Sequence, residues 1–343
     1  MPQAQTGDRT TGDFVLAEYR FQSGAVLPEV RLHYTTVGTP LRDGSGRIRN
    51  GVLVLHGSSG TASQVLADPF TGPLVGPGLP LDPATHFLIV PDLLGMGGST
   101  KPSDGLRRDF PRYGYTDMVD LERRLIAEHF GIERLRAVMG ISMGGMHTWL
   151  WGARYPGMMD ALIPIAALPG RIDGRNLLWR RILSHAIRND AEWNGGHYTS
   201  PPRGYLNIMP MFHMLIQGAA RLGERLGTPE EADQYLAALL AEAAQHDATD
   251  ILYRFEASFD YDISSDLEAI EAPVLAILFA DDELNPTELG TIERLIPRVR
   301  RGRHVMIPAG PQTDGHRTQV RAAVWSSHVA AFLASLPPLE GLR

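Results

Sequence analysis

The chain has 343 residues, of which 43% are hydrophobic and 21% charged, a balance typical of a globular protein with one large α/β domain. Its formal net charge of −7, with acidic and basic residues interspersed, argues against a nucleic-acid partner, which would favour a basic face. The sequence contains no cysteine, so a thiol nucleophile, a disulfide framework and a cysteine-ligated metal are excluded.

The N-terminal segment, residues 1–13, is polar and lacks the apolar core of a signal peptide. No apolar run approaches the roughly 18 residues that a membrane span needs, so we expect no membrane partner. The sequence therefore predicts a cytoplasmic protein, or a periplasmic or secreted one if a signal peptide has been removed.

The strand and helix patterns predict an α/β fold with a mostly parallel central sheet flanked by helices. Residues 14–21 and 29–36 alternate apolar and polar, which indicates an antiparallel pair at the sheet edge. Short apolar runs follow, each ending in turn residues, with helix-patterned segments between several of them. The apolar runs are 51–57, 86–92, 135–142, 161–167, 273–282 and 304–310, and the helical segments are 117–130, 143–155 and 317–336.

Residues 170–255 interrupt this alternation because they are rich in helical patterns and contain no evident strand. Within them, Thr228 followed by Pro229 and Glu230 is typical of a helix N-terminus. We interpret the region as a helical lid inserted into a core formed by residues 1–169 and 256–343. A separate helical domain is the alternative, but both flanks continue the same sheet pattern.

The stretch Gly140-Ile141-Ser142-Met143-Gly144 matches the nucleophile-elbow motif G-x-S-x-G after an apolar strand. In that motif a strained strand-to-helix turn raises the serine hydroxyl above the sheet. The alternative is an ordinary tight turn, in which the glycines supply only backbone freedom.

A serine nucleophile needs a base and an orienting acid, which follow it in the order acid, then histidine, on this scaffold. Asp281 and Asp282 come at the end of the strand 273–282, and His316 lies in the loop after the strand 304–310. We assign Asp282 as the acid and His316 as the base of Ser142, with Asp281 as the structural alternative. Taken singly, the aspartates could be turn or N-cap residues and His316 a surface histidine.

Two backbone amides are expected to bind the oxyanion that forms on the substrate carbonyl. One is that of Met143, the residue after the nucleophile, and the other is assigned to Ser58 in the loop after the strand 51–57, with Ser59 as runner-up. The segment 92–100 lacks the G-x-x-x-x-G-K-[ST] pattern of a phosphate loop and is interpreted as a loop flanking the site. No metal-ligand spacing occurs, so we predict neither a metal nor a bound cofactor.

The chain resembles the α/β-hydrolase superfamily and, more narrowly, homoserine O-acetyltransferase-like proteins. The resemblance covers most of the chain and is carried by GISMGGMH, FPRYGYTDMV, AIRNDAEWNGGHY, DDELNP and GHRT. It implies an α/β-hydrolase fold, with Ser142, Asp282 and His316 in the positions of the nucleophile, acid and base. In the acetyltransferases an acidic residue after the histidine helps to hold the substrate amine, but here that position is Arg317, which argues against homoserine.

The leading hypothesis is therefore a serine hydrolase that cleaves a carboxylic ester or related acyl compound through a Ser-His-Asp triad and an acyl-enzyme. The alternative is an acetyl-CoA-dependent O-acyltransferase of the homoserine O-acetyltransferase type, acting on an alcohol acceptor. A minor alternative is a non-catalytic ligand-binding protein. The expected partner is a small-molecule acyl substrate, and the resemblance also suggests a homodimer.

Overall fold

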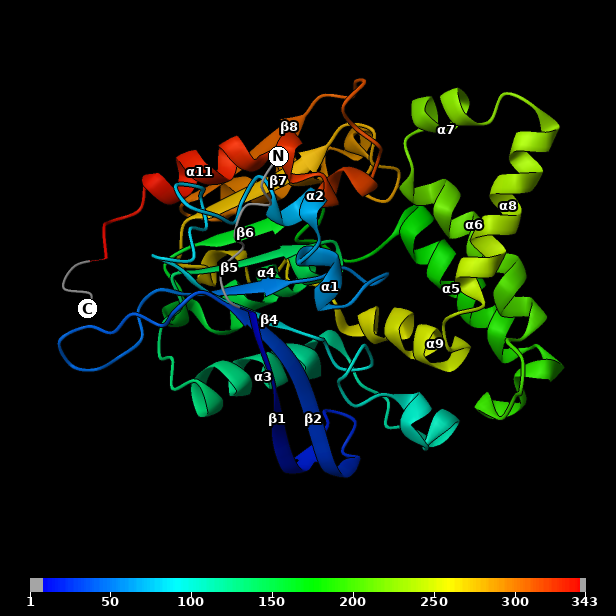
Figure 1. Ribbon diagram of the computed structural model, residues 1–343, viewed down its shortest axis with the longest axis horizontal. Helices are drawn as coiled ribbons and strands as arrows, with labels where there is room; N and C mark the ends of the chain where they lie inside the picture. Colours follow the sequence, from blue (N-terminus) through cyan, green and yellow to red (C-terminus); the bar gives the residue numbers. More distant parts are fainter. Residues whose placement is uncertain (1–8, 340–343) are drawn as a thin grey trace.

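The computed structural model describes residues 9–339 as an eight-stranded sheet with helices on both faces (Figure 1). The strand order is β1-β2-β4-β3-β5-β6-β7-β8. β1 pairs with β2 and β2 with β4 antiparallel, and the other neighbours are parallel. The antiparallel edge pair and the mostly parallel sheet are as the sequence predicts. The strands are β1 (Arg9–Arg20), β2 (Val26–Val37), β3 (Gly51–Leu55), β4 (Phe87–Pro91), β5 (Ala137–Ile141), β6 (Leu162–Ile165), β7 (Val274–Phe279) and β8 (Gly302–Ile307).

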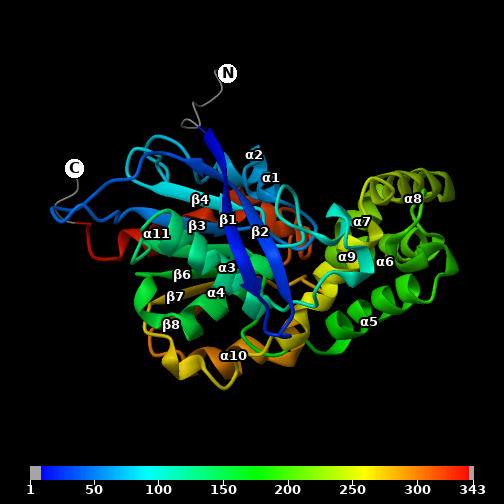
Figure 2. The same ribbon diagram turned by 90° about the horizontal axis from the view of Figure 1, so that it is seen from below.

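Both faces of the sheet are buried because alternate residues of its central strands enter two different apolar clusters. In β3, Leu53 and Leu55 join the cluster beneath one face, whereas Val52 and Val54 join the other. The first cluster includes side chains of α3 (Tyr115–Arg124), α4 (Met143–Arg154) and α10 (Thr291–Leu295). The second includes those of α1 (Ala62–Val65), α2 (Asp68–Thr71) and α11 (Ser326–Ala334) (Figure 2).

The C-terminal helix differs from the sequence prediction of one helix over 317–336. The structure has two short 3₁₀ turns, Arg317–Val320 and Ala322–Val324, before α11 begins at Ser326. Thr318 explains the difference, because its hydroxyl accepts from the Asp314 amide and its carbonyl accepts from the Trp325 indole. These bonds hold the segment after His316 in a tight loop.

Five helices lie between β6 and β7 and form a group beside the sheet, on the right in Figure 1. They are α5 (Gly174–Arg188), α6 (Arg203–Ile216), α7 (Ala219–Arg225), α8 (Pro229–Ala243) and α9 (Ala248–Glu256). This group has its own apolar cluster, in which the rings of Trp179 and Phe212 stack with centroids 5.2 Å apart. We refer to residues 170–255 as the helical segment and propose that it acts as the lid over residues 1–169 and 256–343.

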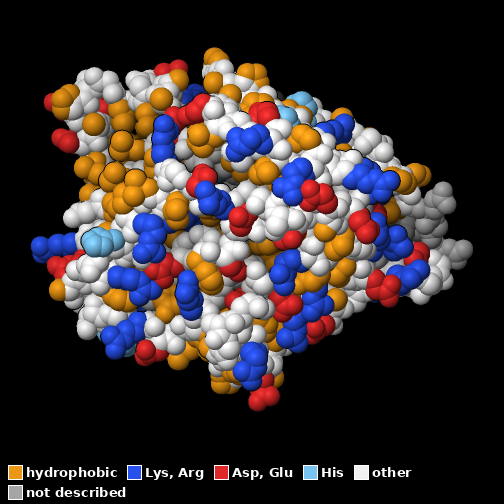
Figure 3. Space-filling view, turned by 180° about the vertical axis from the view of Figure 1, so that it is seen from behind, with side chains coloured by type: hydrophobic (Ala, Val, Ile, Leu, Met, Phe, Trp, Pro, Cys, Tyr) orange, Lys and Arg blue, Asp and Glu red, His pale blue; other side chains and the backbone are white. Residues whose placement is uncertain are grey.

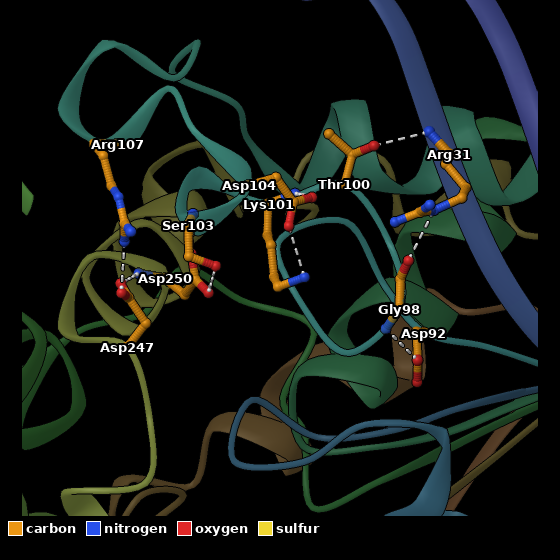
Figure 4. Close-up of polar contacts among 10 residues, drawn as sticks. All are labelled: Arg31, Asp92, Gly98, Thr100, Lys101, Ser103, Asp104, Arg107, Asp247 and Asp250. Atoms are coloured by element: carbon orange, nitrogen blue, oxygen red, sulfur yellow. Dashed lines mark hydrogen bonds and ion pairs between the residues drawn. The ribbon is translucent and has the colours of Figure 1, made fainter.

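The loop after β4 fastens α9 to the sheet-bearing part of the molecule (Figure 4). The amide and hydroxyl of Ser103 donate to the two carboxylate oxygens of Asp250 at 2.8 and 2.7 Å, and Arg107 pairs with Asp247 at 2.9 Å. Asp250 is buried, so these bonds satisfy a carboxylate that would otherwise be costly to bury. As a result α9, the helix of this group nearest the sheet, has a fixed position there.

Within residues 9–339, none of the helices combines the length and apolar character needed to cross a membrane. The same residues contain no group of three or more histidine, aspartate and glutamate side chains able to hold a metal ion.

Candidate active site

Ser142 lies on the turn between β5 and α4, with φ 51° and ψ −115°, a conformation that non-glycine residues rarely adopt. The turn depends on its glycines: a Cβ at Gly140 would collide with the Gly144 carbonyl, and a Cβ at Gly144 with the Leu55 carbonyl. The close packing of α4 on β5 and β3 therefore requires glycine at both positions. The strained turn predicted from the motif is present.

The three side chains that the sequence nominates as a triad meet at the carboxyl ends of the strands. The Ser142 hydroxyl lies 2.8 Å from Nε2 of His316, and Nδ1 of His316 lies 2.7 Å from Oδ2 of Asp282. All three residues are buried. Since the Nδ1–H group of His316 donates to Asp282, Nε2 is left as the acceptor for the serine hydroxyl, as a general base must be.

Asp282 is held by further hydrogen bonds that keep it an acceptor. Its Oδ1 accepts from the Leu284 amide at 2.9 Å, and its Oδ2 accepts from the Asn285 side chain at 2.8 Å. Asn285 also donates to the Ala166 carbonyl at 3.0 Å, which ties the loop after β7 to the end of β6.

Asp281 has a different environment, because it supports the loop that presents His316. Its Oδ2 accepts from the Thr313 hydroxyl at 2.8 Å and from the Gly315 amide at 3.0 Å. Gly315 has φ 55°, the left-handed conformation that turns the chain just before His316. The structure therefore brings Asp282, and not Asp281, to the imidazole.

The predicted oxyanion donors lie in the expected loops. Met143 is the first residue of α4, and Ser58 is buried in the loop after β3. In the hydrogen-bond network of residues 9–339, neither backbone amide has an acceptor, so both are free to bind an oxygen. Ser59 lines the same cavity as Ser58 and Ser142, so the runner-up assignment stays open.

Arg254 of α9 holds the loop that contains Ser58 through a hydrogen bond, and this contact was not predicted from the sequence. Its Nη1 donates to the Ser58 carbonyl at 2.9 Å, and its guanidinium is buried, so desolvation lowers its pKa. The two residues are 196 positions apart, and no local pattern in the sequence links them.

His56, one residue before Gly57, is the second unpredicted support of this loop. Its Nδ1 donates to the Gly57 carbonyl at 2.8 Å, and its Nε2 accepts from the Leu93 amide at 3.1 Å. Both contacts suit a neutral imidazole, and burial lowers the pKa of His56 to about 4.

A cavity of about 320 Å³ opens above Ser142 and His316. Its walls come from the α1–α2 region, from the segment after His316, and from α6 and α8 of the helical segment. The apolar lining residues are Ala67, Pro69, Phe212, Ile216 and Val320, and the polar ones besides the serines are Gln64, His213, Glu242, Arg317 and Gln319. A chamber that combines an apolar wall with polar groups suits a small acyl compound that carries polar substituents.

Arg317 and Glu242 place opposite charges in the lining of this cavity, one beside His316 and one on α8. The Arg317 guanidinium lies 3.9 Å from Asp314 and is 45% exposed, so it is available to a ligand. Burial lowers the pKa of the nearby His213, with Glu242 opposing this effect and Arg317 reinforcing it.

The family model described as the alpha/beta hydrolase fold matches residues 51–310. The chain therefore belongs to the α/β-hydrolase fold family, the class that the sheet order and the nucleophile elbow already indicate.

Relatives of known sequence place it within this family. It is 34% identical to the "Probable acyltransferase" of Methanothermobacter thermautotrophicus over 288 residues, which cover 83% of this chain and 87% of that protein. It is 32% identical to the homoserine O-acetyltransferase of Chlorobaculum parvum over 314 residues, covering 82% and 84%. The chain is thus an enzyme of the homoserine O-acetyltransferase-like branch.

Solved structures agree on the fold. Esterase E22 superposes with a TM-score of 0.82 at 19% identity, covering 95% of this chain and all of that one. The homoserine O-acetyltransferase from Bacillus anthracis superposes with a TM-score of 0.82 at 24% identity, covering 96% and 98%.

Proposed function

We propose that this protein is an O-acyltransferase that forms an acyl-enzyme on Ser142 and passes the acyl group to an alcohol. The observation that carries the proposal is the unbroken hydrogen-bond chain from Ser142 through His316 to Asp282 beneath the cavity. The names of the relatives that cover four fifths of the chain support transfer to an alcohol over transfer to water.

In the first half-reaction, the Ser142 oxygen attacks the acyl carbonyl while His316 Nε2 takes the hydroxyl proton. The amides of Met143 and Ser58 bind the carbonyl oxygen as it becomes negative. When the tetrahedral species collapses, the bond to the thiol or alcohol leaving group breaks and His316 returns its proton to that group. Acetyl-CoA is the donor that the acetyltransferase relatives suggest.

In the second half-reaction, the acceptor hydroxyl gives its proton to His316 and attacks the acyl-Ser142 carbonyl. Collapse releases the new ester and restores the serine hydroxyl. Asp282 keeps its charge throughout and stabilises the imidazolium that forms twice in each cycle.

Ester hydrolysis, in which water replaces the alcohol, is the second candidate, and Arg317 favours it. An ammonium-bearing acceptor such as homoserine would meet a guanidinium beside His316, which repels it. Water needs no such anchoring group. A purely ligand-binding role is disfavoured because all three side chains of the catalytic chain are in contact.

A partition experiment tests the proposal. The enzyme is supplied with acetyl-CoA or p-nitrophenyl acetate, with and without a panel of alcohols that are neutral, anionic or ammonium-bearing, and both the free acid and the new ester are quantified. We expect ester formation that rises with alcohol concentration at the expense of acetate, and neither product from Ser142→Ala. Acetate alone with every alcohol would establish the hydrolase, and efficient acetylation of homoserine would contradict the role given to Arg317.

A further inference from the structure

A second cavity, of about 700 Å³, lies away from Ser142. It lies between one side of α5, along its length, and the end of α9 with the chain that follows it, and it shares no lining residue with the catalytic cavity. Figure 2 shows α1 and α2, beside the catalytic cavity, at one face of the molecule and α5 at the other. We call it the arginine cavity, since its lining includes Arg112, Arg171, Arg180, Arg181 and Arg188.

The three carboxylates that line the arginine cavity already accept hydrogen bonds, and one of them pairs with an arginine of the cavity. Glu256 accepts from the Ser184 hydroxyl and from two nitrogens of Arg188 at 2.8 and 2.6 Å. Asp260 accepts from the first two backbone amides of α3, at 2.9 and 3.0 Å, and Asp262 accepts from the Ser264 amide at 2.9 Å. Among the described residues, none of these three carboxylates forms an ion pair with a cavity arginine other than Arg188.

Four of the five guanidinium groups, those of Arg112, Arg171, Arg180 and Arg181, have no carboxylate partner closer than 4.0 Å in the described part of the chain. Arg112 lies over the ring of Phe259, 3.8 Å from its centroid, Arg171 approaches Asp173 only to 4.0 Å, and Arg181 has no ion pair within residues 9–339. Figure 3 shows that blue side chains are spread over this face, including its left side, where the helical segment lies. With five arginines against three carboxylates, the lining carries an excess of two positive charges.

One arginine of the arginine cavity, Arg180, is held in a fixed position by hydrogen bonds. Arg180 is 8% exposed, and its Nη1 donates to the Phe255 carbonyl and the Ser258 hydroxyl at 3.3 and 3.0 Å. Its Nε donates to Asn176 at 3.0 Å. Fixed guanidinium groups match phosphate oxygens in geometry and charge better than mobile ammonium groups do.

Aromatic and apolar side chains form the rest of the lining, namely Ile172, Leu177, Phe255, Phe259 and Tyr261. Such surfaces accept a planar ring, and the volume lies within the range of sites for small ligands. We infer that the arginine cavity binds a phosphorylated ligand with an aromatic ring, of the nucleoside diphosphate type. That chemistry is offered by a free nucleotide and by the nucleotide end of CoA.

The two cavities are separated by an aromatic wall. Phe255 of the arginine cavity packs edge-on against Phe212 of the catalytic cavity, with ring centroids 5.3 Å apart. Nucleotide in the arginine cavity therefore leaves Ser142 accessible to a small reagent. The inference does not depend on the acyl-transfer function, because its test measures binding.

The test is titration calorimetry of the whole protein with ADP at low ionic strength, with pyrophosphate and adenosine as partial ligands. Arg171→Ala/Arg181→Ala removes two exposed guanidinium groups from the cavity, and Arg300→Ala removes one from exposed surface outside it. We expect ADP to bind the wild type and Arg300→Ala alike, and the double variant at least about tenfold more weakly, because each charged hydrogen bond to phosphate is strong. Adenosine should bind more weakly than ADP.

A parallel titration with CoA distinguishes the two possible ligands, a free nucleotide and the nucleotide end of CoA. CoA binding that weakens in the double variant assigns the cavity to the nucleotide end of the donor, whereas CoA binding that is unchanged while ADP binding weakens assigns it to a free nucleotide. The inference is overturned if neither ADP nor pyrophosphate binds at millimolar concentration, or if the double variant binds ADP as the wild type does. ADP that blocks fluorophosphonate labelling of Ser142 would place the ligand in the catalytic cavity and overturn it too.

Discussion

Replacing Arg254 by methionine should slow catalysis without destabilising the protein. Arg254 donates to the carbonyl of Ser58, whose amide we assign to the oxyanion, so the substitution frees the loop that carries this amide. A hydrogen bond from a charged donor contributes about 1.5–3 kcal/mol, which corresponds to a factor of about 10–100 in rate. Removal of a whole oxyanion donor costs about 10²–10³ in kcat, so the smaller effect is consistent with a positioning residue.

Stability should respond differently. Arg254 is buried, its Nε has no hydrogen-bond partner in the described structure, and burial lowers its pKa, so the folded state bears a desolvation cost for this charge. Methionine has a similar length and carries no charge, so we expect a melting temperature within a few degrees of the wild type.

The assay is the steady-state turnover of p-nitrophenyl acetate, with thermal unfolding followed in parallel. We expect kcat to fall about 10- to 100-fold in Arg254→Met with KM nearly unchanged, and to recover in part in Arg254→Lys. Arg136→Met is the matched control, because Arg136 is equally buried, at 7% exposed, but lies before β5 at the other end of the strands. A wild-type kcat in Arg254→Met, or an equal loss in the Arg136 variant, would refute the reasoning.

Three further predictions concern the triad, the pH dependence and assembly. Asp282→Asn should lower kcat by a factor of about 10³–10⁴, because the imidazole of His316 loses its orienting carboxylate. Asp281→Asn should lower kcat far less, since the Asp281 side chain hydrogen-bonds to the loop before His316. Equal losses in stopped-flow acylation rates would contradict the assignment of Asp282 as the acid. His56 is neutral when folded, with its pKa lowered to about 4, so its contribution is complete above pH 6.5 and is lost as the pH falls toward 4, about 2 kcal/mol of it by pH 5. Urea unfolding at pH 7.5 and 5 should show a loss of stability that is smaller by about this amount in His56→Gln than in the wild type, and equal losses in the two proteins would contradict it. Leu178 and Met214 are 60% and 66% exposed on α5 and α6, so they offer an apolar surface for the expected homodimer. Light scattering should show a dimer for the wild type and a shift toward monomer for Met214→Glu. A monomeric wild type would contradict the expectation of a homodimer.

The local features of the site could be predicted from the sequence because short-range chemistry determines them. The turn at Ser142 needs glycines two residues to either side, and this requirement is visible in five letters. The order of Asp282 and His316 follows from strand patterns, since polar residues after parallel strands collect at one edge of the sheet. The sequence favours Asp282 over Asp281 as the acid but does not decide between them. The hydrogen bonds do, because Asp282 contacts His316 and Asp281 contacts Thr313.

Features that depend on contacts between distant segments could not be predicted. Nothing near Arg254 indicates that its guanidinium lies under Ser58, because the contact exists only once α9 is docked through Asp250 and Asp247. The single helix predicted over 317–336 was wrong for a related reason. Helical periodicity continues through the segment, but Thr318 uses its polar groups to close a loop beneath His316.

The central claim, that Ser142 carries the acyl group between donor and acceptor, is tested most directly by trapping the intermediate. The enzyme is mixed with acetyl-CoA or p-nitrophenyl acetate, quenched in acid within the first turnover, digested and analysed by mass spectrometry. The account predicts an acetyl group on the oxygen of Ser142. Much less acetyl-Ser142 should form in His316→Ala. The acetyl group should disappear from the wild type when an accepted alcohol is added before the quench. Acetylation of another residue in the active enzyme, or steady turnover by Ser142→Ala, would contradict it.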